Sequence, residues 1–157
     1  MEALANLLGA SDEDVRIIAI QAITRLSPAW GAEKLAEHAK HARGQEGFHT
    51  LLGRLSLGDD ATRKSLEEAL IRDLYDDRFC YPAILALKQY GSETSIPHLL
   101  RLAGSFLGEP TMRITAADAA AKLGSSEGLV WLQKFAEKSG NTEYARQLLA
   151  NYPPQKK

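Results

Sequence analysis

The chain has 157 residues, a formal net charge of -1 and a hydrophobic content of 45%. One domain of this length buries roughly 68–70% of its extended-chain surface on folding. The near-neutral charge argues against the positive field that nucleic-acid or membrane-surface binding requires, so we expect neither partner. The N-terminus has no basic segment followed by an apolar one, and no run of about 18 apolar residues occurs, which favours a cytoplasmic protein.

Apolar residues recur at three- and four-residue intervals and strand-like alternation is almost absent, so we predict an all-helical fold. In chain order, nine helices are expected near residues 11–26, 31–42, 47–57, 60–74, 78–90, 94–106, 110–123, 126–138 and 142–151. Residues 2–9 match the pattern of "IPHLLRLA" in the sixth range, near 94–106, so the chain begins with half a repeat and ends with another. We expect residues 1–152 to form a single repeat domain and residues 153–157 a flexible tail.

Signals at the expected helix ends support these boundaries. Ser11, with Asp14 three residues on, resembles a capping box, and Pro97 and Pro110 fall in first turns, where a missing N–H costs little. Trp30 falls in the turn "SPAWG", where we expect it to close the end of a helical pair.

The helix stops recur with a fixed period. Ser27, Gly58, Gly91 and Gly124 each follow an apolar run and are separated by 31, 33 and 33 residues. We expect the glycines to adopt the left-handed conformation of a helix C-cap. Each period then holds a first helix, a turn and a second helix, which we call the A and B helices of a repeat.

Alignment on these stops brings residues of the same size into register. One column of the A helices holds Ile17, Phe48, Tyr81 and Ile114, and the next two hold small residues: Ala19, Thr50, Ala83 and Ala116, then Ala22, Gly53, Ala86 and Ala119. The B helices share the column Leu35, Leu66, Leu99 and Leu132, which was not used to make the alignment. Repeated small residues predict helices that stack closely there.

The stretches "DEDVRIIAIQAITRLS" and "EPTMRITAADAAAKLG" resemble the HEAT repeat, in the short bacterial form also seen in phycobilisome-lyase-like proteins. Arg16 and Arg113 carry the fuller motif, whereas Gly47 and Cys80 occupy the arginine position in the other two repeats. The resemblance implies a right-handed superhelix (an α-solenoid) of about four helical hairpins. In it, A helices are convex and B helices line a concave groove that usually binds protein. For Arg16 we expect a structural contact between an A helix and the neighbouring turn.

B-helix residues beside the shared leucine should point away from the A helices and into this groove. The candidate contacts for a protein or peptide partner are Lys34, Glu37, Glu68, His98, Arg101, Trp131 and Lys134. One column, Glu37, Glu68, Arg101 and Lys134, changes from acidic to basic along the chain, which could orient an extended partner. Trp131 is either an anchor flanked by Arg101 and Lys134 or a packing residue against Tyr144 or Leu148.

Few residues suggest chemistry. Cys80 is the single cysteine, which excludes an intrachain disulfide and a cysteine zinc site, and we expect it to be a small buried apolar residue. His38 and His41 share one side of a helix, but no third ligand has a recognisable spacing, so no metal is expected. Glu67 and Glu68 lie in a charged run that predicts solvated intrahelical pairs.

We therefore expect a non-enzymatic binding scaffold, monomeric rather than oligomeric, with no catalytic residue and no cofactor. Two alternatives stay open. The first, which rests on family analogy alone, is a chromophore-lyase-like or nucleobase-processing enzyme. The second is a structural segment of a longer solenoid, which the half repeats at both ends would suit.

Overall fold

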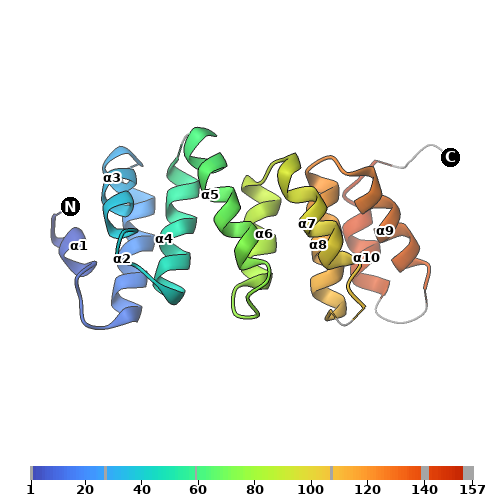
Figure 1. The fold of residues 1–157 in the computed structure, drawn as a ribbon, viewed down its shortest axis with the longest axis horizontal. Helices are drawn as coiled ribbons and strands as arrows, with labels where there is room; N and C mark the ends of the chain where they lie inside the picture. Colours follow the sequence, from blue (N-terminus) through green and yellow to red (C-terminus); the bar gives the residue numbers. More distant parts are fainter. Residues whose placement is uncertain (1, 27, 59, 107, 139–141, 154–157) are drawn as a thin grey trace. The chain divides into compact units, whose positions relative to one another are not determined.

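The computed structural model describes residues 2–26, 28–58, 60–106, 108–138 and 142–153, and all regular structure in these ranges is helical. The helices are α1 (Glu2–Leu7), α2 (Glu13–Leu26), α3 (Pro28–His38), α4 (Gly44–Leu57), α5 (Asp60–Asp73), α6 (Cys80–Tyr90), the 3-10 helix η1 (Glu93–Ser95), α7 (Ile96–Ala103), α8 (Pro110–Lys122), α9 (Ser126–Ala136) and α10 (Thr142–Leu149) (Figure 1). The all-helical prediction is confirmed. The described ranges hold ten α-helices, one more than the nine expected, because α1 also forms. Among the described residues, no helix combines the length and apolar character needed to cross a membrane.

The chain divides into two compact units, Met1–Leu66 and Glu67–Lys157, and the division falls within α5. We describe each unit by itself. The single repeat domain over 1–152 stays a prediction. Of the expected tail, residues 154–157 lie outside the described residues.

The first unit has its core between α2 and α3. Ile20, Ile23 and Leu35 are almost fully buried, and partly buried residues pack around them: Leu4, Leu8, Trp30 and Leu57. The expected packing role of Trp30 is confirmed, but its placement in a turn is wrong. α3 already begins at Pro28, because proline is well suited to the first position of a helix.

Small residues let the helices of the first unit approach closely. A Cβ atom added at Gly53 would lie 2.7 Å from Leu35 Cδ1, and one at Gly31 would lie 3.0 Å from the carbonyl oxygen of Ile23. The first small column is buried throughout, with exposed fractions of 1%, 1%, 0% and 0% at Ala19, Thr50, Ala83 and Ala116. The expectation of close packing is therefore confirmed for the first small column, whereas Ala22 of the second column is only half-buried.

The second unit is built around α8, which packs against α6, α7, α9 and α10. Figure 1 shows α8 between α6 and α10. All residues from 114 to 121 are buried, so this helix is enclosed on every side rather than on one face. Gly128 of α9 allows a close approach, since a Cβ atom there would lie 2.7 Å from the carbonyl oxygen of Ala117. Leu99 and Leu132, from the shared leucine column, complete this core at 0% exposed.

Three expectations about helix ends need correction. The cap of α2 is Asp12 rather than Ser11, because the Asp12 carboxylate accepts the backbone N–H of Asp14 at 2.8 Å. Gly58 and Gly91 have φ values of -74° and -72°, so only Gly124, with φ of 101°, has the left-handed backbone expected of all three. Glycine is needed at 91 for space, since a Cβ atom would lie 2.5 Å from the carbonyl oxygen of Leu87.

Other local expectations hold. Arg16 Nη1 donates to the carbonyl oxygen of Ala10, in the turn before α2, at 2.7 Å. Arg113 Nε donates to the carbonyl oxygen of Ala103, the last residue of α7, at 2.9 Å and so joins α8 to the end of the preceding helix. Pro97 and Pro110 lie in first turns. Cys80 is buried, and burial raises the pKa of its thiol, with the charge of Asp77 adding to the effect.

Candidate functional site

Several of the predicted contacts lie on α7 and α9, two helices of the second unit. We call this set, with Tyr75 added, the α7–α9 surface and define it by Tyr75, His98, Arg101, Trp131 and Lys134. The helices α7 and α9 are in contact with each other. Four of these five residues are contacts predicted from the sequence. Tyr75 is included because it contacts His98 and Arg101 in the structure.

Tyr75 lies in the turn after α5 and is 54% exposed. Its hydroxyl is 3.2 Å from Nδ1 of His98, and the two rings meet edge to face with centroids 6.4 Å apart. His98 is half-buried on α7, and its contact with the Tyr75 hydroxyl holds the tyrosine ring in place. The pair fixes an exposed aromatic ring against the surface of α7.

Arg101 follows His98 by one helical turn and therefore shares its face of α7. Its Cζ atom is 5.8 Å from the centroid of the Tyr75 ring, within the range of a cation–π contact. A cation–π contact does not use the N–H groups of the guanidinium as hydrogen-bond donors to the ring, so these groups can donate to another molecule. Arg101 is exposed, so these donors are directed to solvent or to a ligand.

Trp131 on α9 is half-buried and lies between two other side chains. Its ring stacks on Phe135 with centroids 5.0 Å apart and an angle of 14° between the planes, and the Cζ atom of Arg113 lies 5.5 Å from its centroid. Arg113 thus has two partners, the Ala103 carbonyl and this ring. The exposed Lys134 follows one turn after Trp131 and adds a second positive charge to the surface.

The remaining candidate contacts lie elsewhere. Lys34 and Glu37 belong to the first unit, where Lys34 Nζ is 3.9 Å from Glu33 and Glu37 is 2.6 Å from Lys40 Nζ. The hydrogen bond and charge of Lys40 hold the pKa of the exposed Glu37 below its ordinary value. Glu68 is an exposed residue of α5. Because the predicted change from acidic to basic spans both units, it stays a prediction.

Sequence reasoning missed Tyr75, Phe135 and the second role of Arg113. Tyr75 lies in a turn, where no periodicity reports burial or direction, and its partner His98 is 23 residues away. Only the spacing of Trp131 and Phe135, one helical turn apart, could have suggested that their rings stack.

A second polar cluster lies in the first unit, around the buried carboxylate of Glu46. Arg16 Nε lies 3.0 Å from one of its oxygens and His38 Nε2 lies 2.7 Å from the other. His38 therefore faces a carboxylate from the next helix rather than His41. Within the described ranges, no three histidine, cysteine, aspartate or glutamate side chains are grouped to hold a metal ion.

Comparison with known proteins adds no family. A scan of protein-family models finds none that matches this sequence. A search of curated proteins also finds no match.

Proposed function

We propose that this chain is a non-enzymatic α-solenoid of HEAT-like repeats that binds an acidic segment of another protein through the α7–α9 surface. Support for the solenoid comes from two observations. The sequence repeats every 31 to 33 residues. Within each unit, the main helix contacts join helices one or two places apart in the chain, which is the pattern of stacked hairpins.

The observation that carries the binding proposal is the cation–π contact between Arg101 and Tyr75. An exposed arginine normally loses side-chain entropy when it binds, and this contact reduces that cost because it already restricts the guanidinium. The free edge of the guanidinium matches the two oxygens of a carboxylate. With Lys134 one repeat further along, the surface favours a partner that carries two acidic side chains.

The aromatic residues supply the apolar part of the contact. Tyrosine, tryptophan and arginine are the residues that most often dominate the binding energy of protein interfaces. Tyr75 and Trp131 present rings that are already held by His98 and by Phe135 with Arg113. We infer that an acidic peptide with an apolar residue between its carboxylates fits this surface best.

The test is selection of peptides from a random 12-residue display library on the immobilised full chain. The selected peptides should be enriched in aspartate or glutamate at two positions. Against such a peptide, the double variant Arg101→Ala with Trp131→Ala should lose at least about 10-fold in affinity by fluorescence anisotropy, with an unchanged circular-dichroism spectrum. Arg101→Lys should give an intermediate loss, because lysine keeps the charge but not the two parallel donors.

Lys122→Ala is the matched control, since Lys122 is an exposed cation at the end of α8, outside the α7–α9 surface. It should bind the selected peptides as the wild type does. Selected peptides without acidic enrichment, or acidic peptides that bind the double variant as tightly as the wild type, would refute the proposal.

A further inference from the structure

A hollow in the second unit lies on helices other than α7 and α9. Its volume is about 530 Å³, and six described residues line it: Tyr81, Thr111, Ile114, Glu143, Tyr144 and Gln147. They come from α6, α8 and α10, three A helices of the repeat. Hollows of this volume are typical of sites for small molecules or single side chains.

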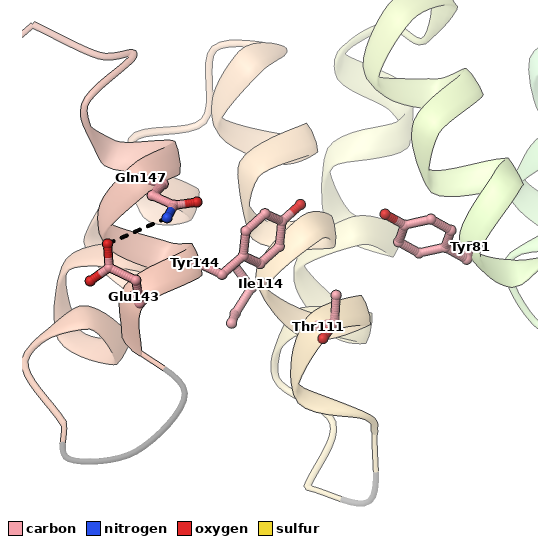
Figure 2. Close-up of a pocket in the computed structure, with 6 residues that line it drawn as sticks. All are labelled: Tyr81, Thr111, Ile114, Glu143, Tyr144 and Gln147. Carbon is pink, nitrogen blue, oxygen red and sulfur yellow. Dashed lines mark hydrogen bonds between the residues drawn. The ribbon is translucent and has the colours of Figure 1, made fainter.

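The residues that line the hollow combine apolar and polar groups and differ in exposure. Ile114 is 1% exposed and Tyr144 is half-buried, whereas Tyr81 is 40% exposed. Tyr81 is an exception in its column, since Ile17, Phe48 and Ile114 are all below 9% exposed. Figure 2 shows Tyr81 projecting from α6 with its hydroxyl directed toward Tyr144, and Glu143 beside Gln147 on α10.

The hydrogen bonds around the hollow leave acceptors facing it. The hydroxyl proton of Thr115 goes to the carbonyl oxygen of Thr111 at 2.8 Å, so in its 3.3 Å contact with Thr115 the Tyr144 hydroxyl is the donor. The lone pairs of Tyr144 then remain free to accept. Gln147 Nε2 donates one of its two N–H groups to Glu143 at 3.4 Å, and the amide oxygen remains able to accept.

The charges of the lining residues also favour a ligand that donates hydrogen bonds. The six lining residues include one carboxylate, Glu143, and no lysine, arginine or histidine. An anion would meet a negative charge and oxygen lone pairs with no cation to bind it. A positively charged group would meet the carboxylate, the acceptor oxygens and the rings of Tyr81 and Tyr144, whose faces attract cations.

We propose that this hollow binds an alkylammonium group, with its charge near Glu143 and its aliphatic part over Ile114. Two sources share this chemistry: the side chain of a lysine in a protein segment, and a free aliphatic amine. The site is separate from the α7–α9 surface, so the two proposals stand or fall independently.

The test is a titration of the isotope-labelled full chain by NMR with n-butylammonium, which has the four-carbon stem of lysine. Amide resonances of residues 111, 114 and 143–147 should shift and saturate. n-Butanol, the uncharged analogue, should bind at least about 5-fold more weakly, because an exposed charge pair contributes about 1 kcal/mol, or about 5-fold. Acetate should not bind, because its charge has the same sign as that of Glu143.

Two single variants probe the two halves of the site. Glu143→Gln removes the charge and should weaken n-butylammonium about 5-fold, and Tyr81→Leu removes one ring and should weaken it about 2- to 5-fold. Both residues are exposed, so folding should be unchanged by circular dichroism. Glu137→Gln, an exposed carboxylate beyond α9, and Tyr75→Leu, on the α7–α9 surface, are the matched controls and should bind as the wild type does.

Equal binding of n-butanol and n-butylammonium, or full binding by both Glu143→Gln and Tyr81→Leu, would overturn the proposal. The source follows from a second titration with acetyl-Gly-Gly-Lys-Gly-Gly-amide. An affinity at least about 10-fold above that of n-butylammonium identifies a lysine in a protein segment, and an equal affinity identifies a free amine.

Discussion

The hydroxyl of Tyr152 donates a hydrogen bond to the carboxylate of Asp118 at 2.7 Å, although Asp118 lies in the middle of α8 and is only 2% exposed. The other carboxylate oxygen is 2.5 Å from Lys88 Nζ on α6. The Tyr152 hydroxyl also contacts the carbonyl oxygen of Asp118, at 3.0 Å. One buried carboxylate therefore joins α6, α8 and the segment after α10.

We expect Asp118→Asn to lower the free energy of unfolding by about 2 kcal/mol, because it leaves Lys88 without its anion. The loss should be smaller than for a fully buried pair, since the Lys88 side chain is 33% exposed and reaches water. Tyr152→Phe removes one hydrogen bond and should cost about 1 kcal/mol. Urea denaturation followed by circular dichroism measures both. A Tyr152→Phe loss as large as that of Asp118→Asn would contradict this order.

The same contact predicts a dependence on alkaline pH. Burial raises the pKa of Tyr152 well above its ordinary value, and the neighbouring Asp118 adds to the shift. A group whose pKa is raised by folding stabilises the protein fully below its unfolded pKa, which is about 10 for tyrosine, and loses this contribution as the pH rises. Between pH 9 and 11, within about one unit of the unfolded pKa, the unfolding free energy of the wild type should fall more steeply than that of Tyr152→Phe. Parallel curves of unfolding free energy against pH for the two proteins would contradict this prediction.

Glu67 predicts the opposite dependence. Its carboxylate is 4% exposed and accepts hydrogen bonds from the backbone N–H of Ser92 at 2.8 Å and from the hydroxyls of Ser92 and Ser95. Burial acts to raise the pKa of Glu67, but these hydrogen bonds outweigh it, and the pKa lies below its ordinary value. The stabilisation is present above the unfolded pKa and is lost as the pH falls through the folded one.

We therefore expect the difference in unfolding free energy between wild type and Glu67→Gln to be about 2 kcal/mol at pH 7 and to shrink as the pH falls below about 4.3. The measurement is a series of urea denaturations from neutral to acidic pH. Glu68→Gln is the matched control, because Glu68 is the adjacent residue of α5 and is exposed. A difference that stays constant across the series would show that Glu67 is not held as a carboxylate.

The sequence predicts the parts of this fold that depend on local periodicity. Helices appear where apolar residues recur at helical spacing, and the small column of Ala19, Thr50, Ala83 and Ala116 is buried because a repeated size pattern reports repeated packing. Boundaries were less well predicted. α3 begins at Pro28 and α4 at Gly44, three residues before each expected start.

Polar contacts between helices could not be predicted in the same way. Glu67 was assigned to a solvated face because glutamate on a charged helix is usually exposed, yet Ser92 and Ser95, 25 and 28 residues away, offer it hydrogen bonds. Lys88 and Asp118 are 30 residues apart. These separations are close to the repeat period, so the repeat indicates which helices meet. It does not indicate which of their polar residues become partners.

Glu46 in the first unit allows buried and exposed ion pairs to be compared. Arg16 and His38 both face its carboxylate, and the side chain of Glu46 is 11% exposed. We expect Glu46→Ala to lower the free energy of unfolding by about 2–3 kcal/mol, because Arg16 and His38 would lose the anion that they share in a low-dielectric site. Lys40→Ala removes the exposed pair with Glu37 and should cost much less, because solvent screens this pair. Similar losses from the two variants would contradict the burial argument.

Gly128 and Gly53, two of the glycines that face neighbouring helices, should respond differently to an added methyl group. At Gly128, the new Cβ atom would lie 2.7 Å from the backbone oxygen of Ala117 and 2.8 Å from the backbone nitrogen of Ala121, and neither atom can move without shifting α8. Gly128→Ala should therefore cost about 1–3 kcal/mol of stability, measured by urea denaturation.

At Gly53, the atoms met are the ends of two side chains, Leu35 Cδ1 at 2.7 Å and Thr24 Oγ1 at 2.8 Å. These side chains can rotate aside, and alanine is favoured over glycine within a helix by about 1 kcal/mol, so Gly53→Ala should change stability by less than about 1 kcal/mol. The order of the two variants is the test, because both add the same methyl group within a helix. If Gly53→Ala is the more damaging, the close packing of α8 against α9 is not the tighter of the two contacts.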